Sequence, residues 1–379
     1  MFQQIILYAF LFATATQLFF WLFFFSRLAL YKTTNSSEAT NQSSNNQPTT
    51  HNSPPVSVII CARNEEENLR NNLYRILNQT YRSYEVLVVN HKSSDNSLDV
   101  LSSLRRKFKH LRIINCDDER AGKKFALAKG IEQARYQILL LTDADCVPAT
   151  TNWVQGMVAG INENTQVVLG VAPYDEAPGP LNKFIRFEAC YTAMQYLAFA
   201  LAGLPYMGVG RNLAYRRELF DRSGGFRRHE YLASGDDDLF INEVAHKGNV
   251  GIRLHPDTFV FSKPKTTWQE YYRQKRRHFT TGRHYKLKHQ ILLFSLTMSH
   301  LLHYVLGFLL VILKISTIFA LLGYAVRMGV VMAVSVLIFN KLQHRSLRLW
   351  VPALDAALVI YYFVFFPSVL MNKDTQRWN

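Results

Sequence analysis

Cysteine is scarce in this chain of 379 residues, and the four that occur lie far apart. No Cys-x-x-Cys pair is present, which argues against a zinc site built on paired cysteines and against a disulfide framework. Few and widely separated cysteines are typical of a protein in a reducing compartment. The four are Cys61, Cys116, Cys146 and Cys190.

Acidic residues are also few, with 28 Asp and Glu against 43 Lys and Arg, a formal net charge of +15. An excess of positive charge indicates anionic partners, such as phosphates, nucleic acid or acidic lipid head groups. The hydrophobic share is 49%. This length and composition allow one large α/β domain together with membrane segments.

Charge is absent from Ile5–Phe25, an apolar stretch long enough to cross a bilayer, which takes about 20 residues. A cleaved signal peptide requires a basic start and a small-residue cleavage site, whereas the start of this chain carries no charged side chain. Arg27 and Lys32 follow the stretch and predict a cytoplasmic downstream side. We therefore expect residues 1–30 to form a transmembrane anchor.

Three further apolar stretches predict a C-terminal transmembrane region over residues 291–371: Leu292–Gly323, Tyr324–Phe339 and Val351–Leu370. Residues 341–348, between the last two, carry three basic side chains and should be cytoplasmic. The chain is thus predicted to be a multi-pass integral membrane protein of a bacterial inner membrane, with its soluble domain in the cytoplasm.

Few polar residues interrupt the C-terminal stretches. His300 and His303 share a predicted helix face without an acidic partner, so we expect them to be packing or interfacial residues and not ligands. Asp355 stands inside the last stretch, where it is either functional or simply close to the start of the span.

Apolar residues are nearly missing from residues 31–54, which are rich in Asn, Ser, Thr and Gln and predict a flexible tether. Beyond it, four β-type runs alternate with helical patterns. This alternation predicts right-handed βαβ units, a mostly parallel sheet covered by helices on both faces, and one domain over residues 55–290. The strands are Val56–Cys61, Glu85–Val89, Leu111–Asn115 and Ile138–Leu141, and the helices include Asn68–Gln79, Ser97–Lys107 and one ending at Ala134.

Later in the domain, Phe184–Leu204 is apolar and aromatic but contains Arg186, Glu188 and Gln195. These polar residues favour a helix in the core or on the membrane surface over a spanning helix.

Two acids follow the fourth strand. Asp143 and Asp145 are two residues apart, so in extended chain both carboxylates point the same way. Like charges this close repel unless a cation lies between them, and Mg²⁺ or Mn²⁺ bridging to phosphate oxygens suits two carboxylates. The alternative is a loop in which Asp145 only caps the next turn.

Ligands of parallel sheets bind beyond the carboxyl ends of the strands, and several motifs fall there in a familiar order. The chain resembles the family-2 glycosyltransferases, which are nucleotide-sugar enzymes with the GT-A (Rossmann-like) fold, from about Pro54 to Lys288. The resemblance is carried by Pro55–Glu65, Glu85–Asp95, Gly122–Gly130, Thr142–Asp145, Gly210–Tyr215, Gly235–Leu239 and Gln274–His278.

The resemblance implies roles for individual residues. Asp145, with Asp143, would hold a divalent cation, Mg²⁺ or Mn²⁺, and Asp236 would be the general base, with Asp237 as its substitute. The alternative for these last acids is a solvated turn that caps a helix. Binding of the nucleotide sugar is implied for Arg63, Glu65, Asn90, Lys123, Asp143, Gln274 and Arg277, and an acceptor-side position for Arg211, Asn212 and His278.

The chain departs from the family at three positions. Asn90 stands where an acid usually contacts the base of the nucleotide, so the usual uridine preference is left open. Gly235 replaces a common Glu. His278 replaces the common Trp, which weakens the case for a processive synthase.

The resulting expectation is a membrane-bound inverting glycosyltransferase. It would move a sugar from a nucleoside diphosphate sugar, with a UDP-sugar expected, to a hydroxyl of a lipid-linked or cell-surface glycan on the cytoplasmic face. The basic, aromatic stretch Trp268–Lys288 predicts contact with anionic membrane lipids, and no nucleic-acid partner is expected. A processive polysaccharide synthase and a non-catalytic membrane scaffold that retains the fold are the alternatives.

Overall fold

The computed structural model describes residues 1–33, 53–117, 122–232 and 234–370. Most of the predicted tether, residues 34–52, lies outside the described residues. The chain divides into two compact units. The helical unit comprises Met1–Tyr31, Ala177–Leu204 and the described residues from Thr266 onward, and the sheet unit comprises the described residues within Lys32–Glu176 and Pro205–Lys265.

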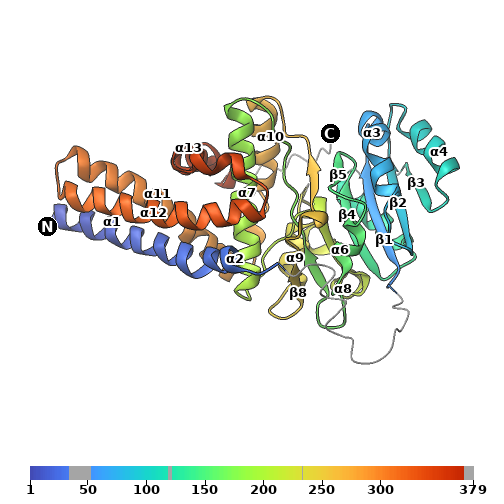
Figure 1. Ribbon diagram of the computed structural model, residues 1–379, viewed down its shortest axis with the longest axis horizontal. Helices are drawn as coiled ribbons and strands as arrows, with labels where there is room; N and C mark the ends of the chain where they lie inside the picture. The colour runs from blue at the N-terminus through green and yellow to red at the C-terminus, as the bar shows by residue number, and fades with distance from the viewer. Residues whose placement is uncertain (34–52, 118–121, 233, 371–379) are drawn as a thin grey trace. The chain divides into compact units, whose positions relative to one another are not determined.

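The sheet unit alternates strands and helices along the chain, as Figure 1 shows. Its first half is β1 (Val56–Ala62), α3 (Glu66–Leu77), β2 (Tyr84–His91), α4 (Ser97–Lys107), β3 (Leu111–Cys116), α5 (Lys123–Gln133), β4 (Ile138–Asp143) and β5 (Cys146–Pro148). Its second half is α6 (Trp153–Val158), β6 (Val167–Leu169), β7 (Leu213–Arg216), α8 (Arg217–Ser223), α9 (Asp238–Val244), β8 (Val250–Ile252) and β9 (Val260–Ser262).

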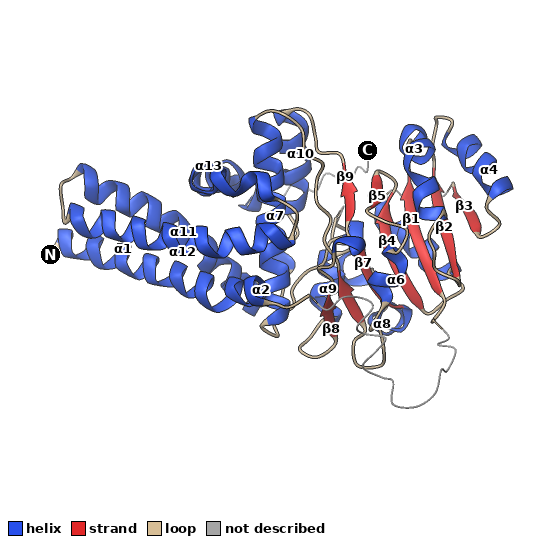
Figure 2. Ribbon diagram, in the orientation of Figure 1, coloured by secondary structure: helices blue, strands red, loops and turns tan. Residues whose placement is uncertain are grey.

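Seven strands form one sheet in the order β3-β2-β1-β4-β7-β6-β8 (Figure 2). The four strands predicted from the sequence pair in parallel, whereas β7 runs antiparallel to β4 and to β6. A separate antiparallel pair joins β5 to β9. The predicted mostly parallel sheet is therefore confirmed.

Helices cover both faces of this sheet because the central strands are apolar on both sides. Every residue of β1 is buried. Val58 and Ile60 belong to the same hydrophobic cluster as Leu69 and Leu73 of α3. The intervening Ile59 faces α5 on the opposite side, where a side chain larger than hydrogen at Gly130 would collide with it. Gly130 thus lets α5 lie close against the sheet.

The helical unit contains four helices that are long and apolar enough to cross a membrane. The first, Phe2–Leu30, combines α1 (Phe2–Phe19), a π-helical turn (Phe20–Phe25) and α2 (Ser26–Leu30). The others include α11 (Leu287–Ile312), α12 (Thr317–Lys341) and α13 (Val351–Leu370), and the unit also holds α7 (Pro180–Leu201) and α10 (Trp268–Phe279). One N-terminal and three C-terminal apolar helices were predicted, and this number is confirmed.

The predicted boundary between the second and third apolar helices was wrong. The chain breaks at Lys314 and Ser316, which have φ values of 53° and 49°, and not at Gly323. Gly323 lies inside α12, where an added Cβ would approach the Phe10 ring of α1 to 2.6 Å. The glycine therefore serves close packing of two helices instead of ending one.

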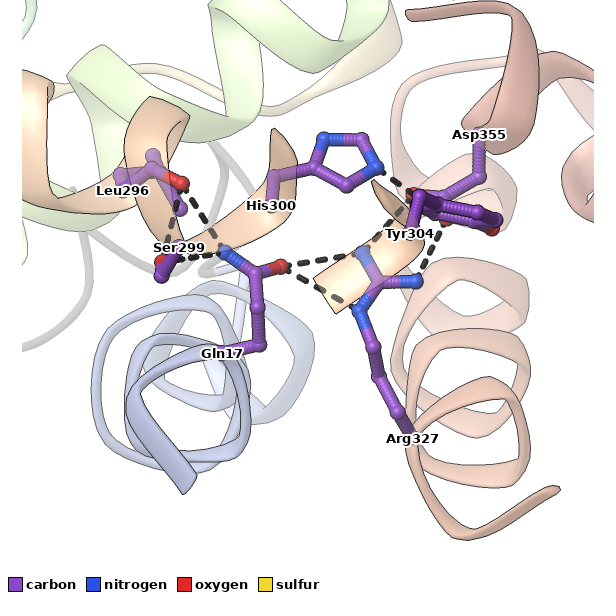
Figure 3. Close-up of polar contacts among 7 residues, drawn as sticks. All are labelled: Gln17, Leu296, Ser299, His300, Tyr304, Arg327 and Asp355. Carbon is purple, nitrogen blue, oxygen red and sulfur yellow. Dashed lines mark hydrogen bonds and ion pairs between the residues drawn. The ribbon is translucent and has the colours of Figure 1, made fainter. Parts of the chain in front are cut away.

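A buried ion pair links α12 and α13, as Figure 3 shows. Arg327 Nη1 lies 2.6 Å from Asp355 Oδ2, and both residues are 1% exposed. The side-chain oxygen of Gln17, from α1, accepts a hydrogen bond from Arg327 Nη2 at 2.9 Å. Tyr304, from α11, donates its hydroxyl to Asp355 at 2.7 Å. The network thus joins all four long apolar helices.

The expectation that His300 and His303 have no acidic partner was wrong for His300. Its Nε2 lies 3.5 Å from Asp355 Oδ2. His303 instead contacts the hydroxyl of Thr14, at 2.9 Å, and stacks on the ring of Phe10. The acid is 55 positions away and on another helix, so helical periodicity could not associate it with His300.

Candidate functional site

The parallel strands bring several predicted site residues to one edge of the sheet unit. In the strand register, Cys61 is paired with Asp143, Ala62 with Asn90, and Asn90 with Asn115. Strand β2 extends through Asn90 and His91, two residues beyond the end of the predicted strand Glu85–Val89. Because these positions all end parallel strands, their side chains and the loops that follow them lie at the carboxyl edge, where such sheets bind ligands.

The loops after β1 and β2 are tied together at this edge. The backbone N–H of Glu65 donates to Ser97 Oγ, and that of Glu66 donates to Asp95 Oδ2, each at 3.0 Å. Arg63, half-buried, directly follows β1 and enters the same loop. These bonds fix the backbone that presents Arg63 and Glu65.

Glu65 belongs to an acidic group. Burial raises the pKa of its carboxyl, a hydrogen bond from Asn68 lowers it, and the charges of Asp145 and Asp143 raise it again. The Asn68 amide donates to Glu65 Oε2 at 2.6 Å. The charges of Asp143 and Asp145 therefore act on the Glu65 carboxyl at this edge.

Lys123 lies between two acids that come from different parts of the chain. It is the first residue of α5, and its Nζ is 2.7 Å from Asp143 Oδ1 and 3.5 Å from Asp236 Oδ2. Burial alone would lower the pKa of the Lys123 ammonium, but Asp143 and Asp236 hold it well above its ordinary value. Lys123 therefore stays charged and joins the β4 acid to the Gly235–Leu239 motif.

Asp145 follows Asp143 after one alanine, and its carboxylate accepts a hydrogen bond from the Cys146 thiol at 3.3 Å. Burial and the neighbouring charge of Asp143 raise the pKa of Asp145, and Arg211 lowers it. The next helix, α6, has Asn152 as its N-cap, so Asp145 does not cap it.

The three acids of Gly235–Leu239 are distinguished by their contacts. Asp237 is the N-cap of α9, and its carboxylate accepts the backbone N–H groups of Gly210 at 2.6 Å and Asp238 at 2.8 Å. Burial, together with Asp236 and Asp238, raises the pKa of Asp237 to about 7. Asp236 is 8% exposed and pairs with Lys123. The motif is therefore no solvated turn, although one of its acids does cap a helix.

Gly235, one of the three departures from the pattern that the sequence resembles, is favoured by the backbone. Its φ is +99°, and an added Cβ would lie 2.4 Å from Leu239 Cδ1. A non-glycine residue is therefore disfavoured both by the positive φ and by the contact with Leu239.

The two predicted acceptor-side residues of the Gly210–Tyr215 motif behave differently. Asn212 is fully buried, donates to the carbonyls of Val171 and Thr258, and accepts from the Trp153 indole. Its side chain is thus used within the fold. Arg211 packs over the ring of Tyr174, with Cζ 4.3 Å from the centroid.

Arg211 also donates to the hydroxyl of Ser262 in β9. Tyr174 and Ser262 were not foreseen, because no motif marks them and both lie far from Arg211 in sequence. An isolated parallel bridge brings these two residues together.

Asn90 is 7% exposed, and its amide donates to Asn115 Oδ1 at 3.4 Å. Its own Oδ1 is buried and accepts no hydrogen bond from the residues that the structure describes. An unsatisfied buried acceptor at a ligand-binding edge suits a donor group of a ligand.

Gln274, Arg277 and His278 lie on α10 of the helical unit. Their proposed roles therefore rest on the sequence motif.

The residues at the sheet edge fit a hard divalent ion. Within the described ranges, no three His, Cys, Asp or Glu side chains are arranged to hold a metal. Asp143 and Asp145 offer two carboxylates, and Mg²⁺ typically takes one or two carboxylates together with substrate phosphates and water. A site completed by a phosphate-containing ligand is consistent with this set.

Comparison with known proteins agrees with the fold and the motifs. Residues 57–224 match the family described as "Glycosyl transferase family 2". The chain is 27% identical to "Probable glycosyltransferase YdaM" of Bacillus subtilis over 230 residues, 57% of this chain and 52% of that protein. It is 36% identical to "Glycosyltransferase AglE" of Haloferax volcanii over 178 residues, 46% of this chain and 56% of that protein. The chain thus spans about half the length of these curated relatives.

A solved structure shares the fold over nearly the full length of both chains. The mannosyltransferase PcManGT from Pyrobaculum calidifontis, in complex with GDP-Man and Mn²⁺, superposes with a TM-score of 0.59, covering 97% of this chain and 99% of that one. The identity is 18%, so the similarity concerns the fold alone. It confirms the predicted GT-A fold class.

Proposed function

We propose, on the premise that residues 57–224 form a glycosyltransferase family 2 domain, that this protein transfers a sugar from a nucleoside diphosphate sugar to an acceptor hydroxyl at a membrane. The transfer inverts the anomeric centre. The observation that carries the proposal is the position of Lys123 between Asp143 and Asp236, because it unites a cation-binding acid and a candidate base around one charge.

Asp143 and Asp145 would hold Mg²⁺ or Mn²⁺, which supplies charge stabilisation to the diphosphate as it departs. Asp145 supports this role through its burial beside a like charge, which a cation would relieve. Glu65 adds negative charge nearby. The Lys123 ammonium group, beside Asp143, would bind the diphosphate oxygens.

Asp236 takes the proton from the acceptor hydroxyl as its oxygen attacks the anomeric carbon. The bond between that carbon and the diphosphate oxygen breaks, its electron pair leaves with the diphosphate, and the sugar ends with inverted configuration. Asp237 is less suited to this step, because both its oxygens accept backbone N–H groups. Lys123 beside Asp236 favours the ionised carboxylate that a base requires.

The nucleotide base would lie against Asn90, whose unsatisfied Oδ1 can accept the N–H of a pyrimidine or purine ring. Arg63 and the α10 residues Gln274 and Arg277 complete the donor site in this proposal, with Arg211 and His278 on the acceptor side. A UDP-sugar remains the first donor to try, with GDP-sugars beside it, because a neutral amide does not require uridine.

The acceptor is proposed to be a lipid-linked or cell-surface glycan. Four helices of membrane-spanning length support an acceptor held in the bilayer, since a soluble acceptor gives no reason for them. The basic residues that follow the first span and separate the last two support a cytoplasmic active site.

The proposal is tested by diphosphate release from a panel of nucleotide sugars with detergent-purified full-length protein. Many transferases slowly pass the sugar to water, so one donor should release its nucleoside diphosphate with Mn²⁺ or Mg²⁺ and stop with EDTA. Adding a membrane lipid extract should accelerate release and label the lipid, and product length then separates single transfer from processive synthesis. Binding of a donor without release, with or without lipid, would favour a non-catalytic scaffold.

A further inference from the structure

Helix α7 carries a buried carboxylate, Glu188, that the proposed reaction does not use. Glu188 is 5% exposed, and its Oε2 forms an ion pair with Lys275 Nζ and accepts the hydroxyl of Tyr271 at 3.3 Å. Its Oε1 accepts the hydroxyls of Thr192 at 3.2 Å and Tyr361 at 3.3 Å. Both carboxylate oxygens are therefore committed within the helical unit.

These contacts join three helices at one point. Tyr271 and Lys275 are one turn apart on the same face of α10, Tyr361 comes from α13, and Glu188 and Thr192 belong to α7. Because Tyr271 and Lys275 both contact Glu188, they fix the position of α10 along its axis and its rotation about that axis.

The ion pair is unusual for a helix as basic as α10. Lysine side chains usually extend to water and keep their charge solvated. The Lys275 side chain is instead 12% exposed, and that of Glu188 is 7% exposed. Losing one partner would leave the other charge largely buried, so the pair tolerates little movement of α10.

Helix α10 also carries Gln274, Arg277 and His278. We infer that Glu188 is a positioning residue, which sets the orientation of α10 and thereby of the motif residues Gln274 and Arg277 that this helix carries. The positioning role is argued from the contacts of Glu188 within the helical unit and does not depend on the proposed function. The catalytic consequence rests on the proposed function.

The first test is hydrogen exchange of residues 268–279 in the full-length protein in detergent. Glu188→Gln keeps an acceptor for the tyrosines but removes the charge, and it should speed exchange in α10 by about tenfold, as should Lys275→Gln. The reversed pair, Glu188→Lys with Lys275→Glu, should recover most of the protection. Arg273→Gln removes a charge from the exposed face of the same helix and should leave exchange unchanged.

The second test is steady-state transfer with the donor identified by the panel. Glu188→Gln should raise the KM for donor and lower kcat/KM by about tenfold, while Mn²⁺ affinity stays at the wild-type value. The reversed pair should restore kcat/KM together with the protection of α10, which a loss of folded protein would not produce.

Unchanged exchange in α10 overturns the inference. If exchange in α10 is faster but KM and kcat stay at their wild-type values, Glu188 orients α10 without affecting transfer, and the catalytic part of the inference is overturned. A wild-type protein that turns over no donor would instead count against the proposed function, and exchange alone would then decide whether Glu188 orients α10.

Discussion

The ammonium group of Lys123 lies 2.7 Å from the carboxylate of Asp143, and 3.5 Å from that of Asp236. Asp143 ends a strand of the parallel half of the sheet, whereas Asp236 precedes α9 by two positions. One positive charge thus holds two acids together, and each acid has a different role in the proposed reaction.

Replacing Lys123 by Met should change metal binding and donor binding in opposite directions. Without the ammonium group, Asp143 and Asp145 attract a cation more strongly, so Mn²⁺ should bind the donor-free protein about fivefold more tightly. The KM for donor should rise, because the diphosphate loses a cationic partner. Mn²⁺ titration and steady-state kinetics measure the two effects.

Lys129→Met is the matched control, since Lys129 is partly exposed on the same helix, where its ammonium group pairs with Glu132 and lies over the ring of Phe125. Lys129→Met should alter neither the affinity for Mn²⁺ nor the KM for donor. Mn²⁺ affinity that is the same in Lys123→Met and wild type would show that Lys123 does not compete for Asp143.

Asp237 should make the stability of the protein depend on pH. Its pKa is raised to about 7 from an ordinary value of 3.8, so the folded protein retains a proton that the unfolded chain releases. This contribution is complete below about pH 4 and is lost as the pH rises through about 7. The unfolding temperature of wild type should therefore fall between pH 5 and 7 relative to that of Asp237→Asn.

Asp221→Asn serves as the comparison, because Asp221 is an exposed acid of the same unit. Asp221→Asn should leave the pH dependence of the unfolding temperature as it is in wild type. If Asp237→Asn and wild type give parallel curves from pH 5 to 8, the proton does not reside on Asp237.

The Arg327–Asp355 pair should stabilise the helical unit only as a pair. Arg327→Met or Asp355→Leu alone leaves a buried charge without its partner, which costs about 3–5 kcal/mol. The double variant removes both charges, so its unfolding temperature in detergent should return most of the way to the wild-type value. Lys314→Met, at an exposed residue between α11 and α12, should have little effect.

A double variant as unstable as the sum of the single ones would contradict this reading. It would mean that Gln17, Tyr304 and His300 require the charges themselves.

Much of the sheet unit was predictable because its signals are local. Buried strands such as Val56–Ala62 are continuous apolar runs, and parallel topology brings the residues at their carboxyl ends to one edge. This is why Asp143 and Asn90 could be associated from sequence. The strand alternation required no knowledge of distant contacts.

The features that could not be predicted depend on contacts between distant residues. Asp236 and Asp237 are adjacent in sequence, and nothing local predicts that the Asp237 carboxylate accepts the backbone N–H of Gly210, 27 positions away, while it caps α9. His300 meets Asp355 across a helix interface. Gly323 resembles a helix breaker until the Phe10 ring is seen against it.

The central claim is that Asp236 is the base of a sugar transfer. Its most direct test is single-turnover transfer by Asp236→Asn at saturating donor and Mn²⁺, with donor affinity measured alongside and Asp237→Asn in parallel. We predict that Asp236→Asn lowers the rate by about 10³-fold or more with donor affinity within twofold of wild type, and that Asp237→Asn retains more activity. Near-normal turnover by Asp236→Asn would contradict the account.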